Sequence, residues 1–242
     1  MNVVVTVEHR FRRTPDGRVW TQTQYPRSFW DRYLQVFDQV RVVARVADAA
    51  QVPSDWLPAD GPGVQFHALP DYQGLGGYLK NALSVRAAVG SAVGPSDAVI
   101  LRASSPIANW VVGPVRRQRR PFAVEVVSDP WDTFSPGAFR HPLRGYFRRL
   151  FSDALRRQCR QACAVAYVTR DALQRRYPPG ERTYSTHYSS IDLPPDAFSP
   201  RPRSVDAGDG PLRLICVGAM SQLYKGHDVL IDAAAACLRR GV

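Results

Sequence analysis

The stretch from Leu212 to Arg240, LRLICVGAMSQLYKGHDVLIDAAAACLRR, places a short apolar run, a glycine turn and an amphipathic helix in unbroken order. Residues 212–217 are mostly apolar and rich in strand formers, which predicts a buried parallel strand. Apolar residues then recur at helical spacing from Val229 to Leu238. The stretch therefore predicts strand, loop and helix, the repeating unit of an α/β fold with a doubly wound parallel sheet.

The loop of this unit carries Gly218 and Lys225. A glycine lets backbone N–H groups approach an anion, and a lysine near a helix start adds a positive charge, so the loop is suited to a diphosphate. The alternative is a plain turn with a solvated lysine.

The wording VGAMSQLYKGHDVLIDA resembles the opening of the second, nucleotide-sugar-binding domain of family 4 glycosyltransferases, which show a VG…KG..VLI.A pattern. The resemblance implies a GT-B fold of two Rossmann-like domains. It implies transfer of a sugar from a nucleotide-diphosphate sugar to a hydroxyl acceptor, with retention of configuration and with no metal or other cofactor. Gly218 and Lys225 would hold the donor phosphates, and Lys225 would act as a catalytic residue by stabilising the departing diphosphate.

Two features depart from that family. Ala219 stands where the family often has an arginine, and no Glu-x7-Glu donor motif follows before Val242. We therefore expect the 242-residue chain by itself to lack transferase activity. The expected organisation is an acceptor-side domain at 1–200, a linker rich in proline and glycine at 201–211, and the start of the donor domain at 212–242.

Apolar runs and helical periodicities alternate through the first two hundred residues or so. They predict strands at 2–7, 40–46, 64–69, 97–101, 122–127, 164–169 and 183–189, and helices at 28–37, 74–93 and 143–162, with Pro106 as a further helix start. Ligands of open α/β sheets gather beyond the carboxyl ends of the strands, so the residues that follow the strands are candidate acceptor contacts. These are Glu8, His9, Arg102, Ser104, Asp129, Trp131, Asp132 and Thr169.

The segment 128–132, SDPWD, is the main candidate for the acceptor site. A carboxylate accepts hydrogen bonds from sugar hydroxyls, and an indole face covers the apolar C–H surface of a sugar. Asp129 also stands near the point where the resembled family has a histidine that contacts the reacting sugars, which makes Asp129 a candidate catalytic residue. The alternative is an Asp-Pro turn with a packing tryptophan.

The net charge of +11 comes almost entirely from arginine, because Lys80 and Lys225 are the only lysines. No nucleic-acid-binding motif accompanies this charge, so we expect no nucleic-acid partner. The basic helix at 143–162 could lie on an anionic membrane surface. We favour a solvated surface helix, because its apolar side is needed to cover the sheet. That side comprises Leu143, Phe147, Leu150, Phe151, Ala154 and Leu155.

No run of 18 apolar residues and no leader-like N-terminus is present, which predicts a cytoplasmic protein, at the inner membrane face if 143–162 contacts lipid. Cys159, Cys163, Cys216 and Cys237 form no CxxC pair, so we expect reduced packing residues and no metal. A rival hypothesis is a non-catalytic Rossmann-like module that binds a sugar or an anion. An oxidoreductase is disfavoured, because no GxGxxG follows Val7.

Overall fold

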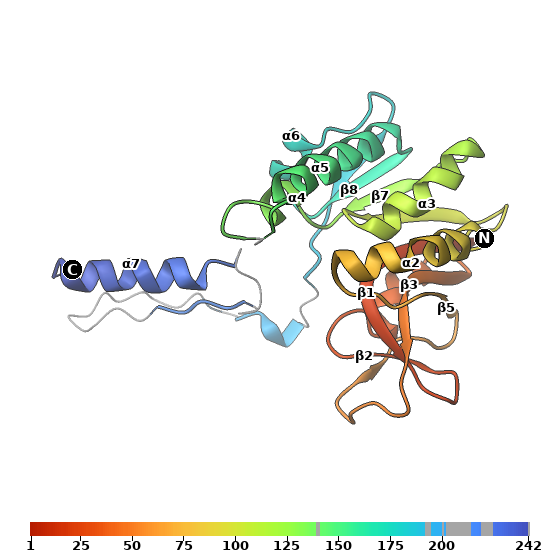
Figure 1. Cartoon of the computed structure of the whole chain (residues 1–242), viewed down its shortest axis with the longest axis horizontal. Helices are drawn as coiled ribbons and strands as arrows, with labels where there is room; N and C mark the ends of the chain where they lie inside the picture. The colour runs from red at the N-terminus through yellow and green to blue at the C-terminus, as the bar shows by residue number, and fades with distance from the viewer. Residues whose placement is uncertain (139–140, 192–194, 200, 202–213, 219–224, 242) are drawn as a thin grey trace.

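A computed structural model describes the chain except for residues 139–140, 192–194, 200, 202–213, 219–224 and 242 (Figure 1). It is an α/β structure built on a nine-stranded, mostly parallel sheet. The strands are β1 (Asn2–Arg13), β2 (Val19–Thr21), β3 (Gln39–Asp48), β4 (Leu57–Pro58), β5 (Val64–Leu69), β6 (Ala98–Ala103), β7 (Ala123–Val126), β8 (Ala164–Tyr167) and β9 (Tyr184–His187). The helices are η1 (Arg27–Trp30), α1 (Asp31–Leu34), α2 (Gly74–Gly90), α3 (Pro106–Arg117), α4 (Pro130–Thr133), α5 (Arg144–Gln161), α6 (Ala172–Arg176), η2 (Pro195–Ala197) and α7 (His227–Arg239).

The parallel strands run in the order β5-β3-β1-β6-β7-β8-β9, and β1 lies between β3 and β6. The chain first builds outward from β1 through β3 to β5, then crosses back to β6 and builds in the other direction. This reversal is the topological switch point of a Rossmann-like sheet, where such folds place their ligands. The fold class predicted from the sequence is confirmed. Two short antiparallel strands, β2 and β4, extend the sheet beside the end of β1.

Strand β1 is longer than the sequence predicts. Val3 to Val7 are buried as expected, but residues 8–13 continue the strand instead of leaving it as a loop. The pairing of β1 with β3 is interrupted between Thr6 and Arg10 and then resumes. Such a bulge turns successive side chains in new directions, and here it contains Glu8 and His9.

Helices cover both faces of the sheet, as alternation along its strands requires. Val4 belongs to one core cluster, together with residues of α2, α3, α5 and α6. Val3 and Val5 belong to the second cluster, which includes Trp30 of η1 and Tyr33 of α1. The predicted helix at 28–37 is therefore present as the shorter pair η1 and α1, which packs its aromatic residues on the sheet.

The prediction that the whole apolar side of the helix at 143–162 covers the sheet is wrong, because only part of that side of α5 is buried. Only Ser152, Leu155, Gln158 and Cys159 of this helix are buried. Leu143, at its N-cap, is 50% exposed and Leu150 is 42% exposed. The reason is geometric, because the side of the helix with Leu155 and Cys159 packs into the core and the stripe with Leu150 does not.

The C-terminal segment also differs from expectation. Residues 214–217 form no strand, and Ile215, Cys216 and Val217 are exposed, because their backbone pairs with none of the described strands. The predicted helix is present as α7, but it buries no residue and lies apart from the sheet (Figure 1). Leu212, Arg213 and the predicted linker at 202–211 lie outside the described residues.

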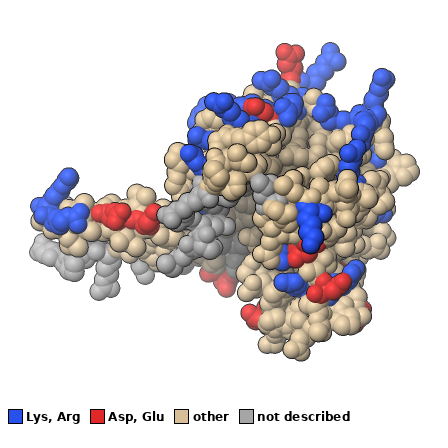
Figure 2. Space-filling model, in the orientation of Figure 1, with Lys and Arg blue, Asp and Glu red and all other residues tan. Residues whose placement is uncertain are grey.

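Charge is distributed unevenly over the chain. Residues 116–182 contain 15 arginines, no lysine and 6 acidic residues, which leaves +9 of the total net charge of +11. These residues include the end of α3 and all of α4, α5 and α6. Figure 2 shows Lys and Arg side chains gathered along the upper side of the molecule, over these helices. The basic character of the protein is thus concentrated on one helical layer.

Candidate functional site

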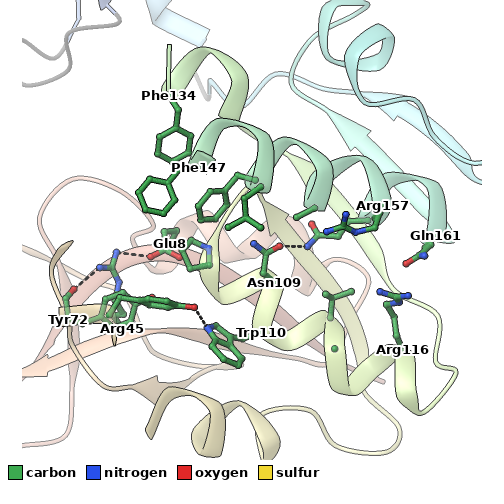
Figure 3. A pocket seen from close by; sticks show the side chains of 18 of the residues that line it. Glu8, Arg45, Tyr72, Asn109, Trp110, Arg116, Phe134, Phe147, Arg157 and Gln161 are labelled. Carbon is green, nitrogen blue, oxygen red and sulfur yellow. Dashed lines mark hydrogen bonds and ion pairs between the residues drawn. The ribbon is translucent and has the colours of Figure 1, made fainter. Parts of the chain in front are cut away.

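A groove of about 760 Å³ lies between α3 and α5 and is closed on a third side by the segment 72–78 (Figure 3). We call it the α3–α5 groove. Its polar end lies beside the bulge of β1, at the switch point of the sheet, and its other end lies beside the last turns of α3 and α5. The lining includes Glu8, Arg45, Tyr72, Tyr78, Asn109, Trp110, Val112, Arg116, Phe134, Phe147, Leu150, Phe151, Ala154, Arg157, Gln158 and Gln161.

The polar end is built around an ion pair between Glu8 and Arg45, with 3.0 Å between Oε1 and Nη2. Arg45 also donates to the carbonyl oxygen of Tyr72 at 2.8 Å, and its guanidinium lies 4.8 Å from the centroid of the Tyr72 ring. The second oxygen of Glu8 accepts from the backbone N–H of Ile107, in the first turn of α3, at 3.4 Å. The carboxylate is thereby held at the mouth of the groove.

Burial raises the pKa of Glu8, and the nearby charge of Arg45 only partly offsets this effect. The Glu8 side chain nevertheless remains 28% exposed, so a ligand in the groove can reach it. A carboxyl group with a raised pKa in a cleft is a candidate for binding and proton exchange with a hydroxyl group.

The middle of the groove is held by hydrogen bonds between its walls. Trp110 donates its indole N–H to the hydroxyl of Tyr78 at 2.6 Å. Gln158 of α5 donates to the side-chain oxygen of Asn109 on α3 at 2.7 Å. Helix α3 begins at Pro106 as predicted, because the hydroxyl of Ser105 accepts from the N–H of Ala108 at 2.9 Å and caps it. That start places Asn109 and Trp110 one turn along, facing the groove.

The remaining wall is apolar and comes mainly from α5. Phe134, the C-cap residue of α4, stacks on Phe151 with 5.4 Å between ring centroids and also contacts Phe147. Leu150 and Ala154 continue this wall toward the far end, where Arg116, Arg157 and Gln161 meet. The groove therefore joins a polar, aromatic end to an apolar channel with a basic exit.

Of the acceptor residues predicted from the sequence, only Glu8 lines this groove. His9 is turned to the opposite side of the bulge, where its ring contacts Phe11 and Tyr25 and its Nε2 lies 3.0 Å from the hydroxyl of Thr21. Burial, aided by the charge of Arg45, lowers the pKa of His9 to about 4. His9 is therefore a neutral packing residue near neutral pH.

Arg102 lies in the core and does not project into the cleft where the sequence places it. It is 5% exposed and forms an ion pair with Glu125 of the neighbouring strand. Tyr33 donates its hydroxyl to Glu125 at 2.9 Å, and Tyr188 donates to the same carboxylate at 3.3 Å. The neighbouring Ser104 donates its backbone N–H to the hydroxyl of Ser128 at 3.3 Å. Neither predicted residue lines the groove.

The segment 128–132 has the geometry of an Asp-Pro turn with a packing tryptophan, the alternative to an acceptor site. Asp129 caps α4 by accepting from the N–H of Trp131 at 2.9 Å, accepts from the hydroxyl of Tyr177 at 2.6 Å, and pairs with Arg176. Asp132 also contacts Arg176, at 3.1 Å. The ring of Trp131 lies under the guanidinium of Arg148, with 3.8 Å from Cζ to the ring centroid.

Thr169 is likewise used in local structure. Its hydroxyl accepts from the N–H of Leu173 at 3.0 Å, in the first turn of α6, whose N-cap residue is Asp171. The predicted donor residues lie in the C-terminal segment, apart from the groove. There Gly218 and Lys225 are neighbours, since a Cβ built on Gly218 would lie 3.6 Å from the Cβ of Lys225. Ala219 lies outside the described residues.

Sequence reasoning missed most of the groove. Arg45, the segment 72–78 and α3 are three separate parts of the sequence, and the proximity of Arg45, Tyr72, Tyr78, Asn109 and Trp110 depends on the crossing from β5 to β6. Only Arg45 carried a local signal, because it is a charged residue within the apolar run 40–46.

Comparisons with known proteins found no family model and no curated protein that matches the chain. Among the described residues, no group of three His, Cys, Asp or Glu side chains is arranged to hold a metal ion. None of the described helices combines the length and the apolar character that crossing a membrane requires.

Proposed function

We propose that this protein is a retaining glycosyltransferase that transfers a sugar from a nucleotide-diphosphate sugar to a hydroxyl acceptor, and that the α3–α5 groove binds the acceptor. The observation that carries the proposal is the polar end of the groove, where a carboxylate and aromatic side chains converge at the switch point of a Rossmann-like sheet. Sites of this kind combine a mostly apolar lining with a few placed polar groups.

The polar end has the chemistry that a sugar or polyol needs. Glu8 accepts hydrogen bonds from hydroxyl groups, and Asn109 offers an amide at the centre of the groove. The rings of Trp110 and Tyr78 provide apolar surface for the C–H face of a sugar. Asp129, by contrast, already has three donors, so the proposal assigns acceptor binding to Glu8.

The proposed donor side is the loop with Gly218 and Lys225. The departing diphosphate gains negative charge as the bond to the anomeric carbon breaks, while the acceptor oxygen forms the new bond on the same face and passes its proton to the departing phosphate oxygen. A lysine beside a glycine turn and the start of α7 would stabilise that charge. In a longer version that also carries a complete donor domain, changing Lys225 to alanine is then expected to lower the rate of transfer at least ~100-fold.

The acceptor side is tested by saturation-transfer NMR with a panel of methyl glycosides. We expect dissociation constants on the order of millimolar, because few atoms of a monosaccharide would be buried. Trp110→Ala should abolish the signal, and Trp131→Ala, a change to the tryptophan that follows β7, should leave it intact.

If Trp131→Ala abolishes the signal and Trp110→Ala leaves it intact, the acceptor site lies at 128–132 and not in the groove. If none of the glycosides binds, the assignment of the groove to a sugar acceptor fails.

A further inference from the structure

None of the described residues covers the apolar wall of the α3–α5 groove: Leu150 is 42% exposed, and Phe147 and Phe151 are only half-buried. Outside the groove lining, Leu143 is 50% exposed and Tyr146 is 61% exposed at the start of the same helix. Amphipathic helices normally bury such a stripe, and contiguous exposed apolar surface marks a site of interaction. A monosaccharide would leave this half of the groove empty.

The size of the groove fits a chain-like small molecule. Its volume of about 760 Å³ lies within the ~300–1,000 Å³ typical of small-molecule sites. Along α5 the wall runs from Phe147 to Gln161, roughly 21 Å at the rise of an α-helix. The bond between Gln158 and Asn109 ties α5 to α3 within the groove.

The surroundings of the groove are basic. Arg149 and Arg157 are exposed on α5, and Arg116 lies at the far end of the groove. They belong to the segment 116–182, which carries +9 of the net charge of +11 (Figure 2). Clusters of arginine on an amphipathic helix are attracted to anionic lipid headgroups.

We infer that the α3–α5 groove takes the apolar chain of a lipid from an anionic membrane, with the hydroxylated head of that lipid at Glu8 and Arg45. The arginines of α5 and of the end of α3 hold the protein at the bilayer surface. The assignment of this lipid as the sugar acceptor rests on the proposed function; the binding of its chain does not.

The chain site is tested by calorimetric titration with hexyl, octyl and decyl β-glucosides, each below its micellar concentration. Affinity should rise roughly fourfold per added CH₂. Leu150→Asp should weaken decyl glucoside binding at least tenfold, and Ala154→Trp, which fills the channel, should do the same. Leu83→Asp is the matched control, because Leu83 is 82% exposed on α2 and does not line the groove.

Affinity that does not depend on chain length, or equal effects of Leu150→Asp and Leu83→Asp, would overturn the inference. If the methyl glycosides still bind in that case, the proposed function stands. If the alkyl glucosides show the chain-length dependence but no methyl glycoside binds, the chain site stands and the proposed binding of a sugar acceptor fails.

The membrane partner is tested by cosedimentation with vesicles of phosphatidylcholine, alone or with 30 mol% phosphatidylglycerol. We expect binding to the anionic vesicles only, reduced at least tenfold by the pair Arg149→Glu and Arg157→Glu. Arg86→Glu, an exposed arginine on α2, is the control. Equal binding to both kinds of vesicle, or no greater loss than for Arg86→Glu, would overturn the membrane assignment. Full retention of Leu150→Asp on the anionic vesicles would show adhesion by charge alone and overturn the role of the groove.

Discussion

Two glutamate–arginine pairs bridge neighbouring strands on opposite faces of the sheet, and they have different roles. Glu125 pairs with Arg102 in a closed interior cage with two tyrosine hydroxyls. Glu8 pairs with Arg45 at the mouth of an open groove, and its second oxygen has only a long bond to a backbone N–H. The comparison teaches that the number of partners around a carboxylate, and not its place at a sheet edge, separates structural pairs from candidate sites.

The largest effect on stability is expected for Glu125→Gln. This change removes the charge that compensates Arg102, which is 5% exposed, and leaves a buried cation. Breaking a buried pair in this way costs about 3–5 kcal/mol. Urea unfolding at pH 7 measures the loss. A cost below about 1 kcal/mol would mean that the two pairs are equivalent and would remove the basis of the comparison.

A smaller loss, about 2–3 kcal/mol, is expected for Asp129→Ala. The variant loses a helix cap and leaves the hydroxyl of Tyr177 without its acceptor. Asp129→Asn keeps the cap and should recover part of the stability. If urea unfolding shows that Asp129→Ala is as stable as the wild type while glycoside binding is lost, Asp129 belongs with Glu8 on the functional side.

His9 shares the bulge with Glu8 and gives a test by pH. Its pKa is lowered to about 4 in the folded state, chiefly by burial, so the unfolded chain binds a proton more readily. The contribution of His9 to stability is therefore present above pH ~6.5 and is lost as pH falls from there toward 4. His9→Phe should reduce this pH dependence by about 1 kcal/mol, because partial exposure weakens the effect. Unfolding at pH 4.5 and pH 7 measures the change, and an unaltered difference would contradict it.

The smallest change in stability is expected for Glu8→Gln, about 1 kcal/mol or less. Glutamine keeps one acceptor oxygen for Arg45, and its NH2 group replaces the oxygen that accepts only the long bond from the N–H of Ile107. Glycoside affinity should nevertheless fall severalfold, which NMR titration can measure beside urea unfolding. If Glu8→Gln lowers the free energy of unfolding as much as Glu125→Gln does, Glu8 and Arg45 form a second structural pair.

The sequence predicts the sheet well where its signal is local. Val64 to Leu69 form the expected strand, and α3 begins at Pro106 as expected. It predicts poorly what depends on distant contacts. Leu150 has the spacing of a core residue, yet another side of α5 packs into the core and Leu150 lines the groove. The use of Asp129 is fixed by Arg176 and Tyr177, more than 40 residues away, and no pattern around Asp129 reveals them.

The bond from Tyr188 to Glu125 has a mechanical consequence. Tyr188 follows the edge strand β9, but its hydroxyl is anchored to a side chain of β7, two strands further in. The chain that continues toward α7 is therefore tethered over the interior of the sheet and not at its rim.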